Sequence, residues 1–335
     1  MMVLQRKFIP VRAAAYVALL VLATTAVSIA AQAADLTWKQ LQPATPFPDR
    51  AAFATAYDPV SKRVIVFGGV DASGILLNDT WTWDGSTWSP VKTRVAPAAR
   101  LGAALAYDRK LRKIVLFGGS TGFARLDDTW LFDGSTMKWK KARPKNVPAA
   151  ASNAVLFVDP INGRVDMYGG RRKMFYSRDT FQWTGTDWRL LEPADSPYPR
   201  AGCVAVLDPL RKDVVVFGGI SDNWVTQNTW TWDGNDWTQL SPTTQPDALY
   251  FTSGAYDPKL KEVVVFGGGD AAVDQDLTWA WDGNDWNKLR PAASPAAREQ
   301  FGTVWDPASQ QFLIFGGTNF GSGEIFGDTW VLTGK

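Results

Sequence analysis

Arginine and aspartate recur in step along this chain. Each of four arginines lies eight residues before an aspartate that ends an apolar segment: Arg50, Arg100, Arg200 and Arg298 precede Asp58, Asp108, Asp208 and Asp306. A guanidinium group binds a carboxylate through two parallel hydrogen bonds. If folding brings these four arginines around one opening, they can clamp an anionic ligand there.

A second set of candidates lies in segments that differ from one part of the chain to the next. They are Arg171, Arg172, Lys173, Tyr176 and Arg178 in RRKMFYSR, Trp224 in ISDNWVTQ, Asp270, Asp274 and Asp276 in GDAAVDQD, and Phe320 and Glu324 in TNFGSGEIFG. Mixed charges beside exposed rings suit a sugar, whose hydroxyls hydrogen-bond while its apolar face stacks on a ring. A peptide or a protein partner fits the same description.

Several chemistries are excluded by composition. The chain contains no histidine, which removes Ser-His-Asp and Cys-His catalysis and the usual histidine sites for zinc or copper. Cys203 is the only cysteine and lies in a small apolar segment, so we expect a buried and unreactive thiol. The aspartates of GDAAVDQD lack the spacing that wraps Ca²⁺. We therefore expect no metal and no cofactor.

The N-terminus has the pattern of a signal peptide. Arg6, Lys7 and Arg12 precede an apolar run, and Ala31-Gln32-Ala33 is a small-x-small cleavage site. An uncleaved membrane anchor is the alternative, because the run approaches spanning length. We expect residues 1–33 to be removed, leaving one domain over 34–335 that is periplasmic or secreted, not membrane-inserted, and monomeric. Loss of three cations takes the formal net charge from +2 to −1, which argues against nucleic acid as a partner.

The elements that must position these residues come from an internal repeat. Paired glycines close an apolar run about every 50 residues, which fits six repeats. The pairs begin at Gly68, Gly118, Gly169, Gly218, Gly267 and Gly316. Each repeat predicts four short strands, as in AAFATAY, RVIVFGG and DTWTW, followed by a strand that begins at Trp88. Asp84-Gly85 between the last two is a strong hairpin signal.

The two ends of the chain complete each other. The sixth repeat stops at Lys335 without its fourth strand, whereas LTWKQL near the N-terminus matches NDWTQL and NDWNKL, which are fourth strands. We expect the N-terminal segment to complete the last repeat and close a ring. Of the 17 tryptophans, all but Trp224 and Trp305 recur at third-strand or fourth-strand positions, which predicts structural packing for them.

The glycine pairs, the third-strand aromatic and the fourth-strand tryptophan resemble the kelch-repeat family over essentially all of residues 34–335. The resemblance implies an all-β, six-bladed propeller with four-stranded blades. It also implies that the repeated arginine can act as a brace for loops. The family often has histidine early in the first strand, which this chain lacks. Galactose oxidase, a kelch enzyme, needs histidine ligands, and the Asp box of sialidases fails here because Asp84 and Gly85 are adjacent.

In such a propeller two connections per blade are tight turns, and the two longer connections emerge together on the opposite face. Loops on a rigid scaffold usually carry binding residues. We therefore expect a non-catalytic module that binds a carbohydrate or a protein there. The alternative is a carbohydrate-active enzyme such as a sialic-acid mutarotase, with Glu324, Glu299 or Glu192 as the base. Drifting surface loops without any ligand remain a third interpretation.

Overall fold

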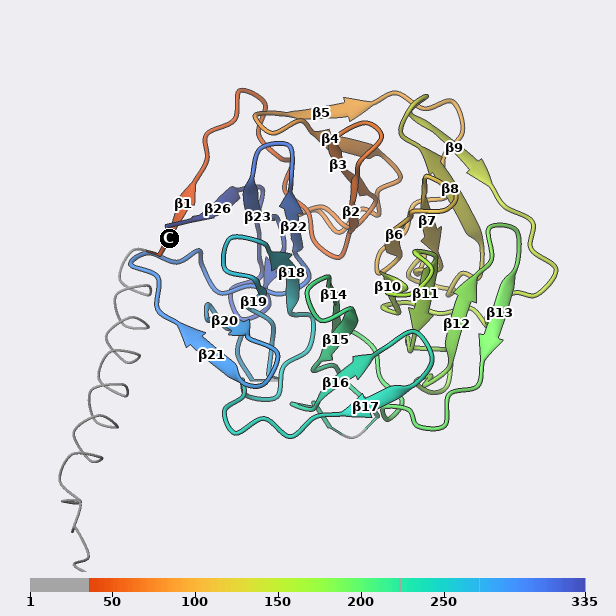
Figure 1. Cartoon of the computed structure of the whole chain (residues 1–335). Coiled ribbons are helices and arrows are strands. Elements are labelled where there is room, and N and C mark those ends of the chain that lie inside the picture. Colours follow the sequence, from red (N-terminus) through yellow and green to blue (C-terminus); the bar gives the residue numbers. More distant parts are fainter. Residues whose placement is uncertain (1–35, 223, 271, 335) are drawn as a thin grey trace, which may run out of the picture.

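The structure is a computed structural model that describes residues 36–222, 224–270 and 272–334. Its strands form six four-stranded antiparallel sheets arranged as blades around a central axis (Figure 1). The predicted signal peptide over 1–33 lies outside the described residues. In the described part of the chain no helix is long and apolar enough to cross a membrane.

The strands follow the repeat, each blade running from the axis outward (Figure 1). Blade one holds β2 (Ala54–Asp58), β3 (Arg63–Phe67), β4 (Thr80–Trp83) and β5 (Trp88–Val91); blade two holds β6 (Ala104–Asp108), β7 (Lys113–Phe117), β8 (Thr129–Asp133) and β9 (Lys138–Lys141). Blade three holds β10 (Val155–Val158), β11 (Val165–Tyr168), β12 (Thr180–Trp183) and β13 (Trp188–Leu191); blade four holds β14 (Val204–Asp208), β15 (Asp213–Phe217), β16 (Thr229–Trp232) and β17 (Trp237–Gln239). Blade five holds β18 (Ser253–Asp257), β19 (Glu262–Phe266), β20 (Thr278–Trp281) and β21 (Trp286–Leu289).

Blade six confirms the predicted closure. It combines β22 (Gly302–Asp306), β23 (Gln311–Phe315) and β26 (Thr329–Thr333) with β1 (Thr37–Gln40) from the other end of the chain. β1 runs antiparallel to β26, with Trp38 opposite Leu332. A short ribbon of β24 (Thr318–Asn319) and β25 (Glu324–Ile325) projects from the same blade. The ring is therefore closed by pairing between the two ends of the described chain.

The second strand of each blade forms the core, because both of its faces are covered by neighbouring blades. Val64, Ile65 and Val66 are fully buried, as the uninterrupted β-branched run predicts. Blade three departs from this pattern with Asp166, a buried carboxyl that accepts hydrogen bonds from Gln182 and from the Trp232 indole. Burial and the nearby Asp159 charge raise the pKa of Asp166 well above its usual range.

The fourth-strand tryptophans join neighbouring blades. Each indole N–H donates to the hydroxyl of the threonine that opens the third strand of the preceding blade, with N···O distances of 2.9–3.0 Å. The six pairs are Trp38–Thr278, Trp88–Thr329, Trp139–Thr80, Trp188–Thr129, Trp237–Thr180 and Trp286–Thr229. These tryptophans are buried and structural, and their polar atoms are satisfied.

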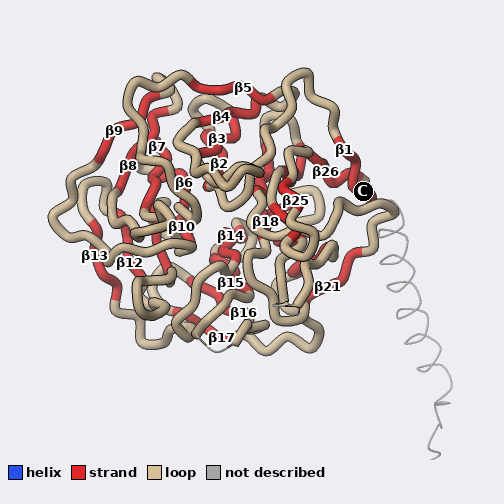
Figure 2. Tube along the Cα trace, turned by 180° about the vertical axis from the view of Figure 1, so that it is seen from behind, coloured by secondary structure: helices blue, strands red, loops and turns tan. Residues whose placement is uncertain are grey.

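The connections divide the molecule into two faces. We call the face with the first-to-second and third-to-fourth strand connections the turn face, and the opposite one the long-loop face. On the turn face the aspartate that ends each first strand is buried and accepts hydrogen bonds from the turn, as Asp58 does from the Val60 and Ser61 amides. Figure 2, seen from behind, shows the longer connections, including the ribbon with β25.

Candidate functional site

The repeated arginines lie shortly before the first strands and are buried within their own blades. Arg50, Arg100 and Arg298 are buried, and each makes two hydrogen bonds of 2.6–3.0 Å to the aspartate that precedes the third strand. The partners are Asp79, Asp128 and Asp328. Each guanidinium also donates to the carbonyl of the first glycine of the pair in its blade. These three groups brace the blades internally and offer no free donor pair to a ligand.

The other blades modify this brace in three ways. Blade four keeps Arg200, which is buried and donates to the carbonyls of Tyr198 and Gly218, but has Asn228 in place of the aspartate. Blade three has Ala151 in place of the arginine, and Arg172 from the loop pairs with Asp179 instead. Blade five replaces both partners, with Leu249 and Leu277. Arg172 is therefore occupied by an ion pair.

The remaining cations of blade three lie on the surface of the long-loop face. Arg171, Lys173 and Arg178 are exposed, and none forms an ion pair with the residues that the structure describes. The Arg171 guanidinium lies 5.8 Å from the centre of the Tyr176 ring. Phe175, which lies between Arg171 and Tyr176 in the sequence, is 51% exposed. This loop presents cationic and aromatic groups together.

An aromatic pair stands on the neighbouring blade. Trp224 is 51% exposed and Tyr198 is 63% exposed, and their ring centres lie 6.5 Å apart in an edge-to-face arrangement. Tyr198 was missed from the sequence. It sits in PYPR just before Arg200, where blades two and six have PAAR, and this departure between repeats is the signal that identifies it. Large exposed rings on a rigid scaffold are typical of binding surfaces.

Blades five and six carry an acidic group on the same face. Glu299 is buried, one of its oxygens accepts a hydrogen bond from Gln300, and the other has no partner among the described residues. Burial, followed by the Asp274 charge, raises the pKa of Glu299 to about 7. The pKa of Asp274 is itself raised by burial and by Asp270. The acidic group on blades five and six therefore contains one carboxyl, that of Glu299, whose protonation state changes near neutral pH.

The other predicted acidic and aromatic residues surround this group loosely. The Asp274 carboxylate accepts a hydrogen bond of 2.5 Å from the Phe320 amide, while the Phe320 ring is 79% exposed. The Asp270 carboxylate accepts hydrogen bonds from the amides of Ala272 and Val273, and these hydrogen bonds hold its pKa below the usual value. Glu324 is exposed on β25. The predicted residues thus fall into a cationic aromatic group on blades three and four and an acidic group on blades five and six.

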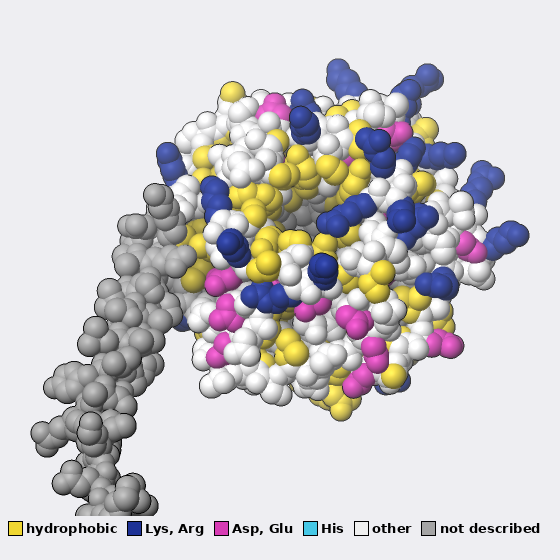
Figure 3. All heavy atoms as spheres, in the orientation of Figure 1, with side chains coloured by type: hydrophobic (Ala, Val, Ile, Leu, Met, Phe, Trp, Pro, Cys, Tyr) yellow, Lys and Arg dark blue, Asp and Glu magenta, His cyan; other side chains and the backbone are white. Residues whose placement is uncertain are grey.

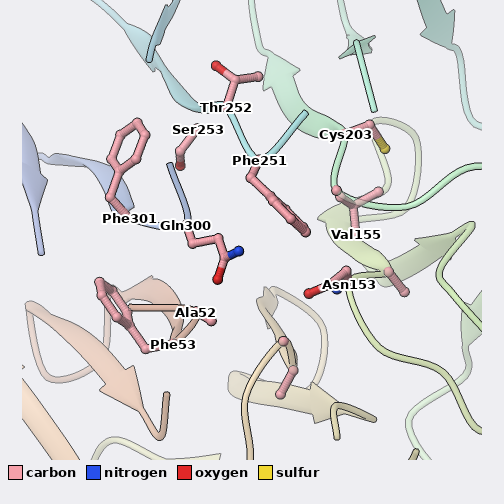
Figure 4. Close-up of a pocket in the computed structure, with 14 residues that line it drawn as sticks. Ala52, Phe53, Asn153, Val155, Cys203, Phe251, Thr252, Ser253, Gln300 and Phe301 are labelled. Carbon is pink, nitrogen blue, oxygen red and sulfur yellow. The ribbon is translucent and has the colours of Figure 1, made fainter. Parts of the chain in front are cut away.

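The central channel opens between these two groups. Six residues at its rim form a closed ring of backbone hydrogen bonds, in which each amide donates to the carbonyl of the equivalent residue in the preceding blade, at 2.7–3.3 Å. They are Ala52, Gly102, Asn153, Gly202, Phe251 and Gln300, all with φ between 53° and 62°. The side chains of Asn153, Phe251 and Gln300 project into the opening, as Figure 4 shows, and the cavity there is about 140 Å³.

Acidic clusters and the single thiol are the remaining reactive groups of the described chain. Within the described residues no group of three or more aspartate, glutamate or cysteine side chains is placed to hold a metal ion. Cys203 borders the channel, but its thiol is buried, and burial raises its pKa to about 11. A thiol with that pKa is almost wholly protonated and a poor nucleophile.

The closed ring of six four-stranded blades defines a β-propeller. A family model described as the KLHDC2/KLHL20/DRC7 Kelch-repeats domain matches residues 24–184. The chain belongs to the kelch-repeat β-propellers.

Similar proteins agree with this family. Adagio protein 3 of Arabidopsis thaliana is 37% identical over 87 residues, covering 25% of this chain and 14% of that protein. An F-box/kelch-repeat protein of Arabidopsis thaliana is 28% identical over 167 residues, covering 44% of this chain and 34% of that protein. The match thus spans at most about a third of these relatives. The solved structure of YjhT has a TM-score of 0.66 at 16% identity, covering 88% of this chain and 99% of that one, which shows a shared fold.

Proposed function

We propose that this kelch propeller is a binding module whose long-loop face takes up a carbohydrate that carries a negative charge. The observation that supports it is the exposed pair Tyr198 and Trp224 beside the unpaired cations of blade three. A flat apolar sugar face stacks on an aromatic ring, and a carboxylate or sulfate on the sugar attracts the guanidinium and ammonium groups. On these two blades the Arg172–Asp179 ion pair and the hydrogen bonds from Arg200 to the Tyr198 and Gly218 carbonyls hold the loops in place for this contact.

The test is a thermal-shift screen of the protein against neutral sugars and their acidic counterparts, including uronic and sialic acids. We expect stabilisation by an acidic sugar that is lost in Trp224→Ala and in Arg171→Gln with Lys173→Gln. Phe123→Ala is the matched control, because Phe123 is a fully exposed ring on blade two outside this group. The proposal fails if no sugar shifts the melting temperature, or if Phe123→Ala removes the shift as completely as Trp224→Ala.

Glu299 favours a second candidate, acid–base catalysis on a sugar at the blade five and six side of the same face. A general acid or base works best with a pKa close to the working pH, and the Glu299 pKa of about 7 meets that condition. Exchange of the anomers of the bound sugar, followed by NMR, should be accelerated by the protein and slowed by Glu299→Gln. Equal exchange rates with and without protein would leave binding as the only function.

We also propose that the protein is exported before it binds its ligand. The support is the sequence pattern of residues 1–33. N-terminal sequencing of the protein recovered from the periplasm or medium should begin at Ala34. Recovery of the intact N-terminus from the cytosol would contradict export.

A further inference from the structure

The turn face holds a cavity at the other end of the central channel. Its volume is about 380 Å³, within the size range of small-molecule sites. All six blades contribute to its wall through the ends of their first strands. In Figure 3 hydrophobic side chains surround a central hollow, and lysine and arginine side chains lie around them with some acidic side chains in between. We call this the turn-face cavity.

The wall of the turn-face cavity is apolar and partly aromatic. Aliphatic groups such as Leu105, Leu156 and Val206 form its depth. Nearer the turns, the residue before the turn aspartate is aromatic in four blades: Tyr57, Tyr107, Tyr256 and Trp305. Burial, followed by the charges of Asp306 and Asp58, raises the pKa of Tyr57 to about 12, so its phenol stays neutral. Such a wall suits the apolar body of a ligand.

One cation lies in the wall itself. Arg109 is exposed and lines the turn-face cavity, and its amide donates to the Gly163 carbonyl at 2.9 Å. Among the described residues no carboxylate lies within ion-pair distance of its guanidinium. Arg109 can therefore donate two hydrogen bonds to a ligand carboxylate.

The rim adds further positive charge. Seven exposed cations of the turns have no ion pair with any described residue: Lys62, Arg109, Lys110, Arg112, Lys212, Lys259 and Lys261. The turn aspartates carry opposing charge at the same end of the channel, but they are buried and bound to turn amides, as Asp257 is to Lys259 and Leu260, so the exposed cations are the charged groups that a ligand can contact. Exposed cations are thus available to a ligand at the inner turns although the formal net charge of the chain is close to zero.

We propose that the turn-face cavity binds a small amphipathic organic anion, with its apolar body against the aromatic wall and its carboxylate at Arg109. This site is separate from the one proposed for the long-loop face. Net charge, which argued against nucleic acid as a partner at the level of sequence, does not report this local arrangement. The residues that signal it are the aromatics before the turn aspartates and the cations within the turns.

The test uses 2-naphthoate as the anionic probe and 2-naphthalenemethanol as its neutral counterpart, titrated into the full chain by calorimetry. We expect naphthoate to bind more tightly than the alcohol, and Arg109→Gln to weaken naphthoate by about fivefold or more while leaving the alcohol unchanged. Leu207→Trp, which fills the cavity, should block both probes. Added salt should weaken only naphthoate.

The matched control is Arg171→Gln with Lys173→Gln on the long-loop face, which should bind naphthoate as the wild type does. Because Arg109 is exposed, its replacement preserves the fold, and circular dichroism checks this for each variant. The proposal is overturned if naphthoate does not bind, if Arg109→Gln binds it unchanged, or if the long-loop variant is the one that loses it. Acidic-sugar binding is scored with different variants, so the two proposals can fail independently.

Discussion

Arg100 and Asp128 show how the brace is built from two residues that are 28 positions apart. The guanidinium is fully buried, the carboxylate is largely buried, and both pay a desolvation cost that their paired hydrogen bonds offset. The Asp128 carboxylate also accepts the Trp130 indole N–H at 2.7 Å. Burial raises the pKa of the Asp128 carboxyl. The hydrogen bonds from Arg100 and Trp130 and the charge of Arg100 outweigh this effect, so the pKa lies below its usual value.

Replacing one partner of this brace should cost far more than replacing both. Arg100→Leu leaves the Asp128 carboxylate without its counter-charge, and we expect a loss of about 3–5 kcal/mol in the free energy of unfolding. Arg100→Leu with Asp128→Leu should recover most of the loss, because blade five already uses Leu249 and Leu277 at these positions. Denaturant titration measures both. A double variant as unstable as the single one would contradict this account.

Glu299 should make stability depend on pH. Its pKa is raised from 4.5 to about 7 on folding, so the folded state holds the proton more tightly than the unfolded state. This tighter proton binding stabilises the folded state fully below pH 4.5, the pKa of the group in the unfolded chain. The stabilisation is lost as the pH rises through about 7, the pKa in the folded state. Glu299→Gln should therefore be more stable than the wild type at pH 8, by on the order of 3 kcal/mol, and similar to it near pH 4. Glu324→Gln, on the exposed ribbon, is the control and should show no such difference.

At the scale of the element, the indole of the fourth-strand tryptophan donates a hydrogen bond across every pair of neighbouring blades. Thr80→Val keeps the shape of the side chain but leaves the buried Trp139 indole N–H without its acceptor. We expect a loss of about 1–3 kcal/mol in the free energy of unfolding. Trp139→Phe combined with Thr80→Val should be less than additive, because both changes remove one interaction. Thr238→Val, at an exposed position of β17, is the control. Strict additivity would show that the bond does not couple the blades.

The strands could be predicted from sequence because each depends on local signals that recur six times. Asp84-Gly85 specifies a hairpin by itself, and Gly68-Gly69, with φ of 69° and 98°, ends a strand by itself. The candidate site depends on contacts between repeats that differ. Tyr198 meets Trp224 only because two loops at blade four converge, and the pKa of Glu299 is raised by its burial and by the charge of Asp274 from the neighbouring blade. Because each of these contacts occurs in only one part of the ring, the repeat pattern in the sequence does not predict it.

The braces show an intermediate case. The partner of Arg50 is Asp79, which opens the DTWTW motif, and the loss of that aspartate at Asn228 and Leu277 is visible in the sequence. The turn aspartates eight residues after each arginine were the more conspicuous companions, but they bind the turn amides instead. Three of the four arginines pair with the aspartate that precedes the third strand of the same blade, so the predicted clamp for an anionic ligand is replaced by a contact within the blade.

For the whole molecule, closure matters because each blade is stabilised mainly by its two neighbours. Without β1, blade six would lose its outer strand, and Trp38, which packs against Phe266 and Phe312, would leave a gap between blades five and six. The Trp38 indole also donates to Thr278 of blade five at 3.0 Å. The chain end thus contributes both to a sheet and to a joint between blades.

Removing residues 34–42 should therefore lower the melting temperature of the whole ring and make unfolding less cooperative. Trp38→Ala isolates the packing part of this effect, and we expect it to cost about 3–5 kcal/mol, the usual range for a buried tryptophan. Lys39→Ala, on the exposed face of the same strand, should leave stability within about 0.5 kcal/mol of the wild type. Calorimetry of the three variants decides the matter. If the shortened chain melts like the wild type, β1 pairs with blade six without supporting it, and closure of the ring must depend on contacts between the inner strands alone.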